Sequence, residues 1–236
     1  MISSMLKYWT EPTYNDLGDH TFWGKVKGTV LIYFFYLAVA IGVFLVLRMI
    51  DSLIVVQFFH HSIVDELMQN NNRVHGKFLL ILFVVPFVEE ILFRLPLRLE
   101  KIGIGLSFSI ITYRLLVEHS LMFDLYDPYA YAKIALAIIP CLLTVRFFPD
   151  SWLVAIKKRY SYYFYFIAAT FALVHVTNFA PYNNSVLLFY PLFTLPQFLM
   201  ALVIGYVRME YGFFYGVALH SLINLPAILI SLAHFQ

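Results

Sequence analysis

The sequence predicts an all-α membrane protein, a polytopic bundle of about seven transmembrane helices with a polar site in its interior. Of its 236 residues, 61% are hydrophobic and only 13% are charged, whereas about 25% are charged in ordinary soluble domains. A soluble protein of this length lacks the interior needed to bury so much apolar and aromatic surface. The apolar runs also recur at lengths near 20 residues, which suit the hydrocarbon core of a bilayer.

Seven apolar segments are expected to cross the membrane. They cover about residues 28–47, 77–97, 102–117, 131–148, 160–179, 185–207 and 212–232. Pro86 should kink the second of them one turn before Glu89. The polar stretch 48–76 either extends the first helix or lies amphipathically on the membrane. Residues 1–27 are expected to form a cytoplasmic or interfacial lead-in, and they lack the basic-then-apolar pattern of a cleaved signal peptide.

The basic residues predict an orientation with the N-terminus inside and the C-terminus outside. The inner side then receives ten of them: Lys7, Lys25, Lys27, Arg98, Lys101, Arg146, Lys157, Lys158, Arg159 and Arg208. The outer side receives five: Arg48, Arg73, Lys77, Arg114 and Lys133. The net charge of +2 favours no nucleic-acid partner. The single cysteine, Cys141, excludes an intramolecular disulfide.

The second apolar segment carries charges that a membrane helix normally excludes. It reads FVVPFVEEILFRLPLR from Phe83 to Arg98, and a charged side chain at membrane depth costs at least about 2.5–3.5 kcal/mol. Glu90 and Arg94 stand four residues apart on one helix face, so they can neutralise each other. Glu89 lies about 100° away around the helix and needs another partner. We therefore expect Glu89 to be the reactive group and Glu90–Arg94 to support it.

Two further apolar segments carry polar side chains at depths that can meet Glu89. His175 lies near the end of the fifth segment, four residues after Phe171, and His220 and Asn224 share a face of the seventh. Alone, each has a bland explanation as a hydrogen-bonding contact between helices. Together they suit a hydrolytic site in which Glu89 takes a proton from water and His175 holds that water or shares its proton. His220 and Asn224 would then donate to the oxyanion.

These residues resemble three motifs of the CAAX-protease and bacteriocin-processing family, also called the CPBP or Abi family. EEILFR from Glu89 to Arg94 resembles its EExxxR motif, FALVH from Phe171 to His175 its FxxxH motif, and HSLIN from His220 to Asn224 its HxxxN motif. The resemblance covers about residues 77–232, so 77–236 is expected to be the catalytic core. Residues 1–76 are expected to supply the lead-in, the first span and an interfacial segment. The family's looser glycine-containing motif has no clear match, although Gly205 and Gly212 lie in the right region.

The resemblance implies an intramembrane endopeptidase that cuts a membrane-associated protein or peptide, typified by the type II CAAX prenyl protease. It implies catalytic roles for Glu89, His175, His220 and Asn224 and structural roles for Glu90 and Arg94. The short chain resembles bacterial members, which implies the bacterial cytoplasmic membrane. A divalent metal, zinc, is an open possibility because Glu89, His175 and His220 could ligate it with one position left for water. The chain has no HExxH motif, and water activated without a metal is the favoured expectation.

Other protease mechanisms, a transporter and a non-catalytic scaffold are the alternatives to this function. A serine mechanism is disfavoured because Ser107 and Ser221 are serines of the kind that bond back to helix carbonyls. An aspartyl mechanism needs paired aspartates within spans, and the aspartates fall near or beyond the predicted span ends. Buried Glu and His residues also serve proton-coupled transporters, and Pro191 with Pro196 could break a helix as transporters do. A non-catalytic membrane scaffold, immunity or regulatory protein with the same bundle is a further alternative.

Overall fold

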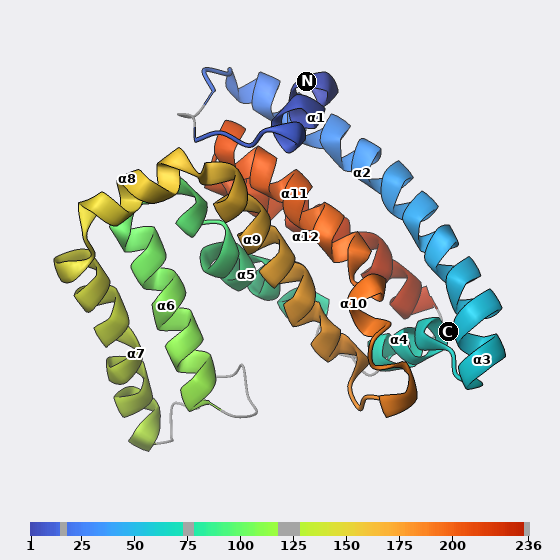
Figure 1. Ribbon diagram of the computed structural model, residues 1–236. Helices are drawn as coiled ribbons and strands as arrows, with labels where there is room; N and C mark the ends of the chain where they lie inside the picture. Colours follow the sequence, from blue (N-terminus) through green and yellow to red (C-terminus); the bar gives the residue numbers. More distant parts are fainter. Residues whose placement is uncertain (15–17, 73–77, 118–127, 234–236) are drawn as a thin grey trace.

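The computed structural model describes residues 1–14, 18–72, 78–117 and 128–233, and every regular element in these ranges is helical (Figure 1). This confirms the all-α class. The longer helices are α2 (Phe22–Ile50), α5 (Val85–Phe93), α6 (Lys101–Leu116), α7 (Pro128–Phe147), α9 (Tyr160–Val174), α11 (Leu195–Glu210) and α12 (Phe213–Ala233). The shorter ones are α1 (Ile2–Thr10), α3 (Gln57–Phe59), α4 (Ile63–Asn72), α8 (Asp150–Lys158) and α10 (Tyr190–Phe193).

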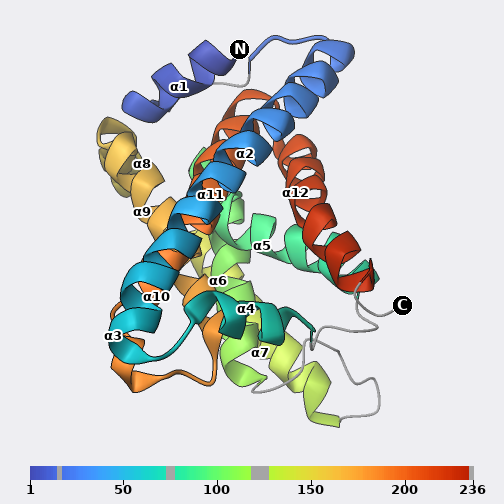
Figure 2. The same cartoon turned by 90° about the vertical axis from the view of Figure 1, so that its right-hand side faces the viewer.

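Helix α11 lies at the centre of the bundle and packs against α9, α12, α2 and α1 (Figures 1 and 2). Ten consecutive residues of α11, from Met200 to Met209, are buried. Helices α6, α7, α9, α11 and α12 alternate in direction, whereas α5 lies across the bundle (Figure 2). Helix α8 joins α7 to α9 at the end where α1 lies, and α4 and α10 lie at the other end. Helices α6 and α7 form an antiparallel hairpin beside the bundle.

Two helices in the described part of the chain are long and apolar enough to cross a membrane. They are Phe22–Phe59 and Tyr129–Phe147, and Phe213–Leu229 is a shorter apolar helix. The first is longer than predicted because α2 continues into a π-helix (Asp51–Val56) and then α3. In the stretch 48–76 the first helix extends to Phe59, and α4 follows as a separate polar helix. That this stretch lies on the membrane stays a prediction.

The predicted sixth segment, 185–207, is not one helix. Its first part contains a 3-10 turn (Asn184–Val186) and the short α10, and α11 begins only after Thr194. Pro191 stands in the first turn of α10 and Pro196 in the first turn of α11. Proline is tolerated at these positions because the first backbone N–H groups of a helix have no partner within it. Each proline therefore begins a new helix.

The second predicted segment is distorted, and the distortion precedes Pro86. Residues Leu80–Val84 form a π-helix, and the Val85 N–H bonds to the Leu80 carbonyl five residues back. Pro86 follows and has no N–H for the Ile81 carbonyl. The Asn224 side chain of α12 donates to that carbonyl instead, at 3.5 Å. The helix ends at Phe93, so Arg94 is its C-terminal cap residue rather than an interior one.

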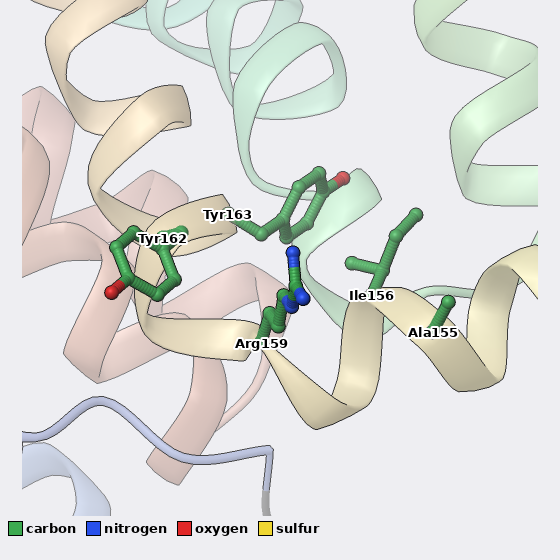
Figure 3. A pocket seen from close by; sticks show the side chains of 5 residues that line it. All are labelled: Ala155, Ile156, Arg159, Tyr162 and Tyr163. Atoms are coloured by element: carbon green, nitrogen blue, oxygen red, sulfur yellow. The ribbon is translucent and has the colours of Figure 1, made fainter.

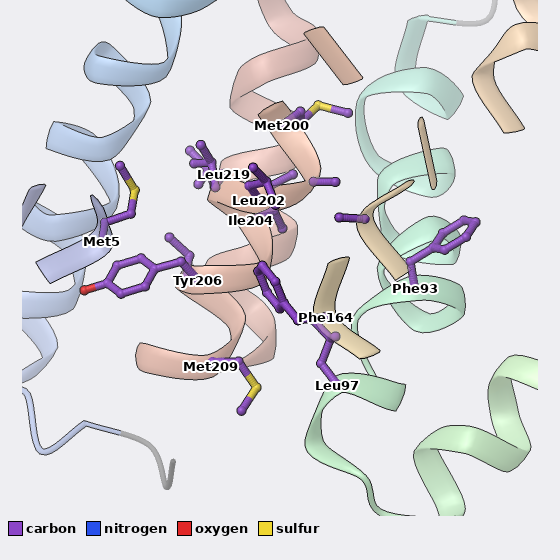
Figure 4. Close-up of a cluster of buried hydrophobic side chains, with 14 of the residues drawn as sticks. Met5, Phe93, Leu97, Phe164, Met200, Leu202, Ile204, Tyr206, Met209 and Leu219 are labelled. Carbon is purple, nitrogen blue, oxygen red and sulfur yellow. The ribbon is translucent and has the colours of Figure 1, made fainter. Parts of the chain in front are cut away.

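Most of the buried side chains belong to one apolar cluster (Figure 4). Met5 of α1, Ile32 of α2, Phe93 of α5, Phe164 of α9 and Leu219 of α12 all pack around α11. Residues before and after position 76 therefore share the same core. The predicted lead-in is part of it, since α1 is a helix whose Trp9 indole donates to the Leu202 carbonyl at 3.3 Å.

The far end of α2 is tied to α4 by polar contacts. Asp51 is buried, and its carboxylate accepts hydrogen bonds from the Ser62 hydroxyl at 2.7 Å and the Ile63 N–H at 2.9 Å. It thereby caps α4 from a neighbouring helix. Arg48 donates to Asp65 at 2.7 Å, and this hydrogen bond lowers the pKa of the Asp65 carboxyl. Two basic residues used to predict orientation, Arg73 and Lys77, lie outside the described residues.

Gly205 should tolerate no side chain. A Cβ added there would lie 2.7 Å from Cε2 and 2.9 Å from Cζ of the fully buried Phe164 ring. We expect Gly205→Ala to lower the free energy of unfolding by about 1–3 kcal/mol, because overpacking a dense core forces neighbours out of position. Reversible unfolding of the purified protein in detergent measures this.

Gly42→Ala is the matched control for that measurement. Gly42 is also helical, and an added Cβ would meet nothing within 4 Å. Alanine is about 1 kcal/mol better than glycine in a helix interior, so this variant should be neutral or more stable. Equal losses in the two variants would contradict the packing of α9 on α11.

Candidate functional site

The charged residues predicted in the second segment lie inside the bundle. Glu90 has no exposed surface and Arg94 is 1% exposed. The Arg94 Nε lies 3.5 Å from Glu90 Oε1, which is the pairing that their four-residue spacing predicts. Glu89, on the adjoining face of α5, keeps 25% of its side-chain surface exposed. One carboxylate is therefore enclosed, while the other reaches the edge of the site.

Phe171 of α9 holds the Arg94 guanidinium. The centre of its ring lies 4.0 Å from Arg94 Cζ, which is a close cation–π contact. Within the described part of the chain, Arg94 Nη1 and Nη2 have no hydrogen-bond partner. The aromatic face thus takes the place of hydrogen bonds. Phe93 packs edge-on against Phe171 at a centroid distance of 5.2 Å, which fixes the ring.

His220 of α12 lies between the two glutamates. Its Nδ1 is 2.9 Å from Glu90 Oε1, and its Nε2 is 3.5 Å from Glu89 Oε2. The imidazole is almost wholly buried, at 1% exposed. Glu90 therefore has two partners, Arg94 on its own helix and His220 on another. The buried Glu90 carboxylate is thus compensated by a guanidinium on its own helix and by a ring N–H donor from a second helix.

His175 lies at the end of α9, where the helix passes into a 3-10 turn (His175–Phe179). Its Nδ1 is 2.8 Å from the Phe171 carbonyl. A carbonyl only accepts, so Nδ1 carries the proton and Nε2 of a neutral ring is left as an acceptor. Its ring lies against Phe171, with centroids 4.5 Å apart, and Phe171 also contacts His220 at 6.0 Å. Phe171 is thus the side chain that Arg94, His175 and His220 share.

Asn224 lies one turn beyond His220 on α12, but its described contact is with the backbone of the π-helix before α5. There the Asn224 amide donates to the Ile81 carbonyl, to which Pro86 has no N–H to donate. The second N–H of its amide remains available to another acceptor. The structure thus brings Glu89, Glu90, Arg94, Phe171, His175 and His220 into one connected set, and Asn224 joins that set through the backbone rather than through a direct side-chain contact.

The contact between Glu90 and His220 was not expected from the sequence. Helical spacing relates Glu90 to Arg94, but the sequence contains no signal that relates a residue of α5 to one 130 positions later. The sequence showed only that both groups were polar within apolar runs and therefore needed partners. Glu90 consequently orients an imidazole as well as pairing with Arg94.

The residues considered for zinc do not form a metal-binding group here. Across the described ranges, no three His, Cys, Asp or Glu side chains are grouped so that they could hold a metal ion. His220 uses Nδ1 on Glu90, and His175 uses Nδ1 on a carbonyl. Both Nε2 atoms remain for other partners, as they do in metal-ligating histidines, so zinc at Glu89, His175 and His220 stays a prediction.

Comparisons with known proteins neither support nor oppose the resemblance. No family model, no curated protein and no solved structure matches this chain. The likeness to the CAAX-protease and bacteriocin-processing family thus depends on the three short motifs and on the geometry that their residues adopt.

We expect Glu90→Gln to destabilise the protein far more than Glu89→Gln. Removing the Glu90 charge leaves the buried Arg94 without its anion, and breaking a buried ion pair in this way costs about 3–5 kcal/mol. Glu89 is partly exposed, so its nearly isosteric replacement should cost little. Unfolding of both variants in the same detergent checks the difference. Comparable stability of the two variants would mean that Glu90 does not hold Arg94 in place.

Phe171→Leu should also destabilise the protein, by about 2–4 kcal/mol, because it removes buried aromatic surface and the cation–π contact to Arg94. Phe166→Leu is the control on the same helix, since Phe166 is 66% exposed. It should change stability by less than about 0.5 kcal/mol. A Phe171→Leu variant as stable as the control would show that Arg94 is held by other groups.

Proposed function

We propose that this chain is an intramembrane endopeptidase that hydrolyses a peptide bond in a membrane-associated protein or peptide with water activated by Glu89. The observation that carries the proposal is the His220 imidazole between two carboxylates, held by Glu90 at 2.9 Å and facing the more exposed Glu89 at 3.5 Å. Partly exposed and partly paired groups of this kind are suited to moving protons.

A polytopic placement with about seven passes, N-terminus inside, is part of the same proposal. The sequence has seven apolar stretches, and helices α6, α7, α9, α11 and α12 alternate in direction. Large apolar side chains such as Leu115, Leu142, Phe166 and Phe214 are exposed, at 78%, 63%, 66% and 76%. Patches of this kind on a protein surface mark contact with a membrane or a partner. A bacterial cytoplasmic membrane fits the basic residues gathered at the end where α1 and α8 lie.

The proposed reaction proceeds in two balanced steps. As a water oxygen attacks the scissile carbonyl carbon, the Glu89 carboxylate accepts one water proton and the carbonyl π electrons move onto oxygen. When the tetrahedral intermediate collapses, its C–N bond breaks and Glu89 returns that proton to the leaving nitrogen. The products are a carboxyl group and an amine, and Glu89 is regenerated.

The other groups have roles that follow from their hydrogen bonds. His175 presents a free Nε2 acceptor, which can hold the attacking water through one of its hydrogens. His220 donates through Nε2 to the oxyanion on the side where Glu89 lies, with the spare N–H of Asn224 as a second donor. Glu90 keeps the His220 ring in the required orientation through its Nδ1.

A second candidate, a proton-coupled transporter, is favoured by one observation. Glu90, His220 and Glu89 form a chain with successive distances of 2.9 and 3.5 Å, from a fully buried carboxylate to a partly exposed one. Such chains conduct protons in pumps and transporters. Proteoliposomes loaded with a pH dye separate the two functions, because a transporter acidifies or alkalises the lumen and a protease does not.

We expect Glu89→Gln to abolish proteolysis while leaving the fold intact. A glutamine cannot accept the water proton, and losing a general base lowers the rate by at least about 10²–10⁴-fold. The measurement is a comparison of protein termini in membranes from cells with the wild-type chain and cells with the variant. Wild-type cells should contain cut substrates that are uncut in the variant.

The control is Glu11→Gln, which removes an exposed carboxylate at the end of α1, far along the chain from the site. It should reproduce the wild-type termini. Termini that are identical in wild-type and Glu89→Gln cells, with both proteins present at equal amounts, would contradict the protease and leave a scaffold or immunity function.

A further inference from the structure

The junction of α8 and α9 forms an open depression with a volume of about 280 Å³. It is lined by Ala155, Ile156, Arg159, Tyr162 and Tyr163 (Figure 3). Its walls are almost wholly apolar, and the Arg159 side chain lies at one side of it (Figure 3). The depression belongs to a different part of the molecule from Glu89 and His220, and none of its residues has a role in the proposed hydrolysis.

The position of α8 puts this depression at a membrane boundary. Helix α8 begins at Asp150, three residues after the end of α7, and α7 contains one of the two helices of membrane-crossing length. Lys101 at the start of α6 pairs with Asp150 at 2.9 Å, which fixes the start of α8 beside another helix end. Trp152 and Val154 of α8 are 60% and 53% exposed. Exposed aromatic and aliphatic side chains beside lysines are typical of a helix that lies in the headgroup zone.

The charge at the depression is positive. Lys157 and Lys158 end α8 and Arg159 follows, so three basic residues are consecutive. Lys157 is turned toward the N-terminal segment, with its Nζ 4.1 Å from the centre of the Tyr14 ring. Arg159 is the basic residue that lines the depression, and its side chain extends toward the Tyr163 ring (Figure 3). Tyr163 is fixed in turn, because its hydroxyl donates to the Pro96 carbonyl at 3.1 Å.

We propose that this depression binds one anionic phospholipid, with the phosphate on Arg159 and the first part of an acyl chain against Ala155 and Ile156. A guanidinium presents a planar fork of donors that matches phosphate oxygens. The volume is slightly below the about 300–1,000 Å³ of pockets that enclose a whole small molecule, so the rest of the lipid remains in the bilayer. The inference depends on the membrane placement and not on the proposed hydrolysis.

The test uses purified wild-type protein in a neutral detergent and measures its thermal unfolding during titration with dioctanoyl phosphatidylglycerol. A ligand that binds the folded state raises the unfolding temperature as its concentration passes its Kd. Dioctanoyl phosphatidylcholine tests the need for negative charge, and inorganic phosphate tests the need for the lipid. We expect phosphatidylglycerol to stabilise the protein most and inorganic phosphate not to stabilise it at the same concentration.

Two variants locate the site. Arg159→Gln should raise the apparent Kd for phosphatidylglycerol at least about fivefold, the effect of one basic residue near an anionic lipid. Ala155→Phe should weaken binding without changing the charge, because its ring occupies the depression. Ala155 is exposed, so Ala155→Phe should fold. It locates the site even where Arg159→Gln does not fold. Arg146→Gln is the control, since Arg146 is an exposed basic residue in the last turn of α7.

Three outcomes would overturn the proposal. Equal weakening by Arg146→Gln and Arg159→Gln would mean that lipid is attracted by surface charge alone. Stabilisation by inorganic phosphate equal to that by phosphatidylglycerol would mean a site for free anions. Unchanged binding in Ala155→Phe would mean that the depression holds no chain. Because no outcome is a measurement of proteolysis, failure here leaves the role of Glu89 untouched.

Discussion

The enclosed ion pair of Glu90 and Arg94 is the constraint on which the arrangement of the bundle depends. Neither side chain has more than 1% of its surface exposed, and removing charges from solvent costs several kcal/mol for each ion before partners compensate. The compensation comes from three helices. Helix α5 supplies the pair itself, α9 supplies the Phe171 ring for the guanidinium, and α12 supplies His220 for the carboxylate. The site and the packing of these helices therefore form together.

This dependence separates the two neighbouring glutamates. Glu90 pairs with the buried Arg94 guanidinium and accepts a hydrogen bond from the His220 imidazole. It therefore stabilises the packing and orients that ring. Glu89 lies one helical step away, retains a quarter of its surface and faces the other nitrogen of the same imidazole. A single-residue step around α5 thus gives one carboxylate a permanent partner and leaves the second able to exchange protons with water.

Backbone irregularities bring the polar groups to their positions. The Ile81 carbonyl in the π-helix before α5 receives no hydrogen bond from Pro86, and the Asn224 amide of α12 donates to it. The end of α9 as a 3-10 turn places His175 against the Phe171 carbonyl. π-helical turns are frequent at functional sites because the extra residue re-aims the side chains around it. Here the irregular turns lie on two of the three helices that build the site.

The sequence by itself determined the helical class, the apolar stretches, the pairing of Glu90 with Arg94 and the set of polar residues that needed partners. These follow from composition and from the 3.6-residue period, which act within one segment. Pro191 and Pro196 marked where 185–207 could break, but the sequence could not determine that the segment divides into α10 and α11, or that the first ten residues join the core. Those outcomes depend on competition between local preference and packing against distant helices.

The tertiary structure alone decided that His220 lies between Glu89 and Glu90, that the Phe171 ring packs against the Arg94 guanidinium, and that Asn224 donates to a backbone carbonyl. Each of these contacts joins residues on different helices, and helical periodicity says which face a residue occupies but not which helix that face meets. A buried charge requires a partner, and the charged residues within apolar segments show that such partners must exist. Only the packing of α5, α9 and α12 specifies the partner, because several polar side chains could have met it.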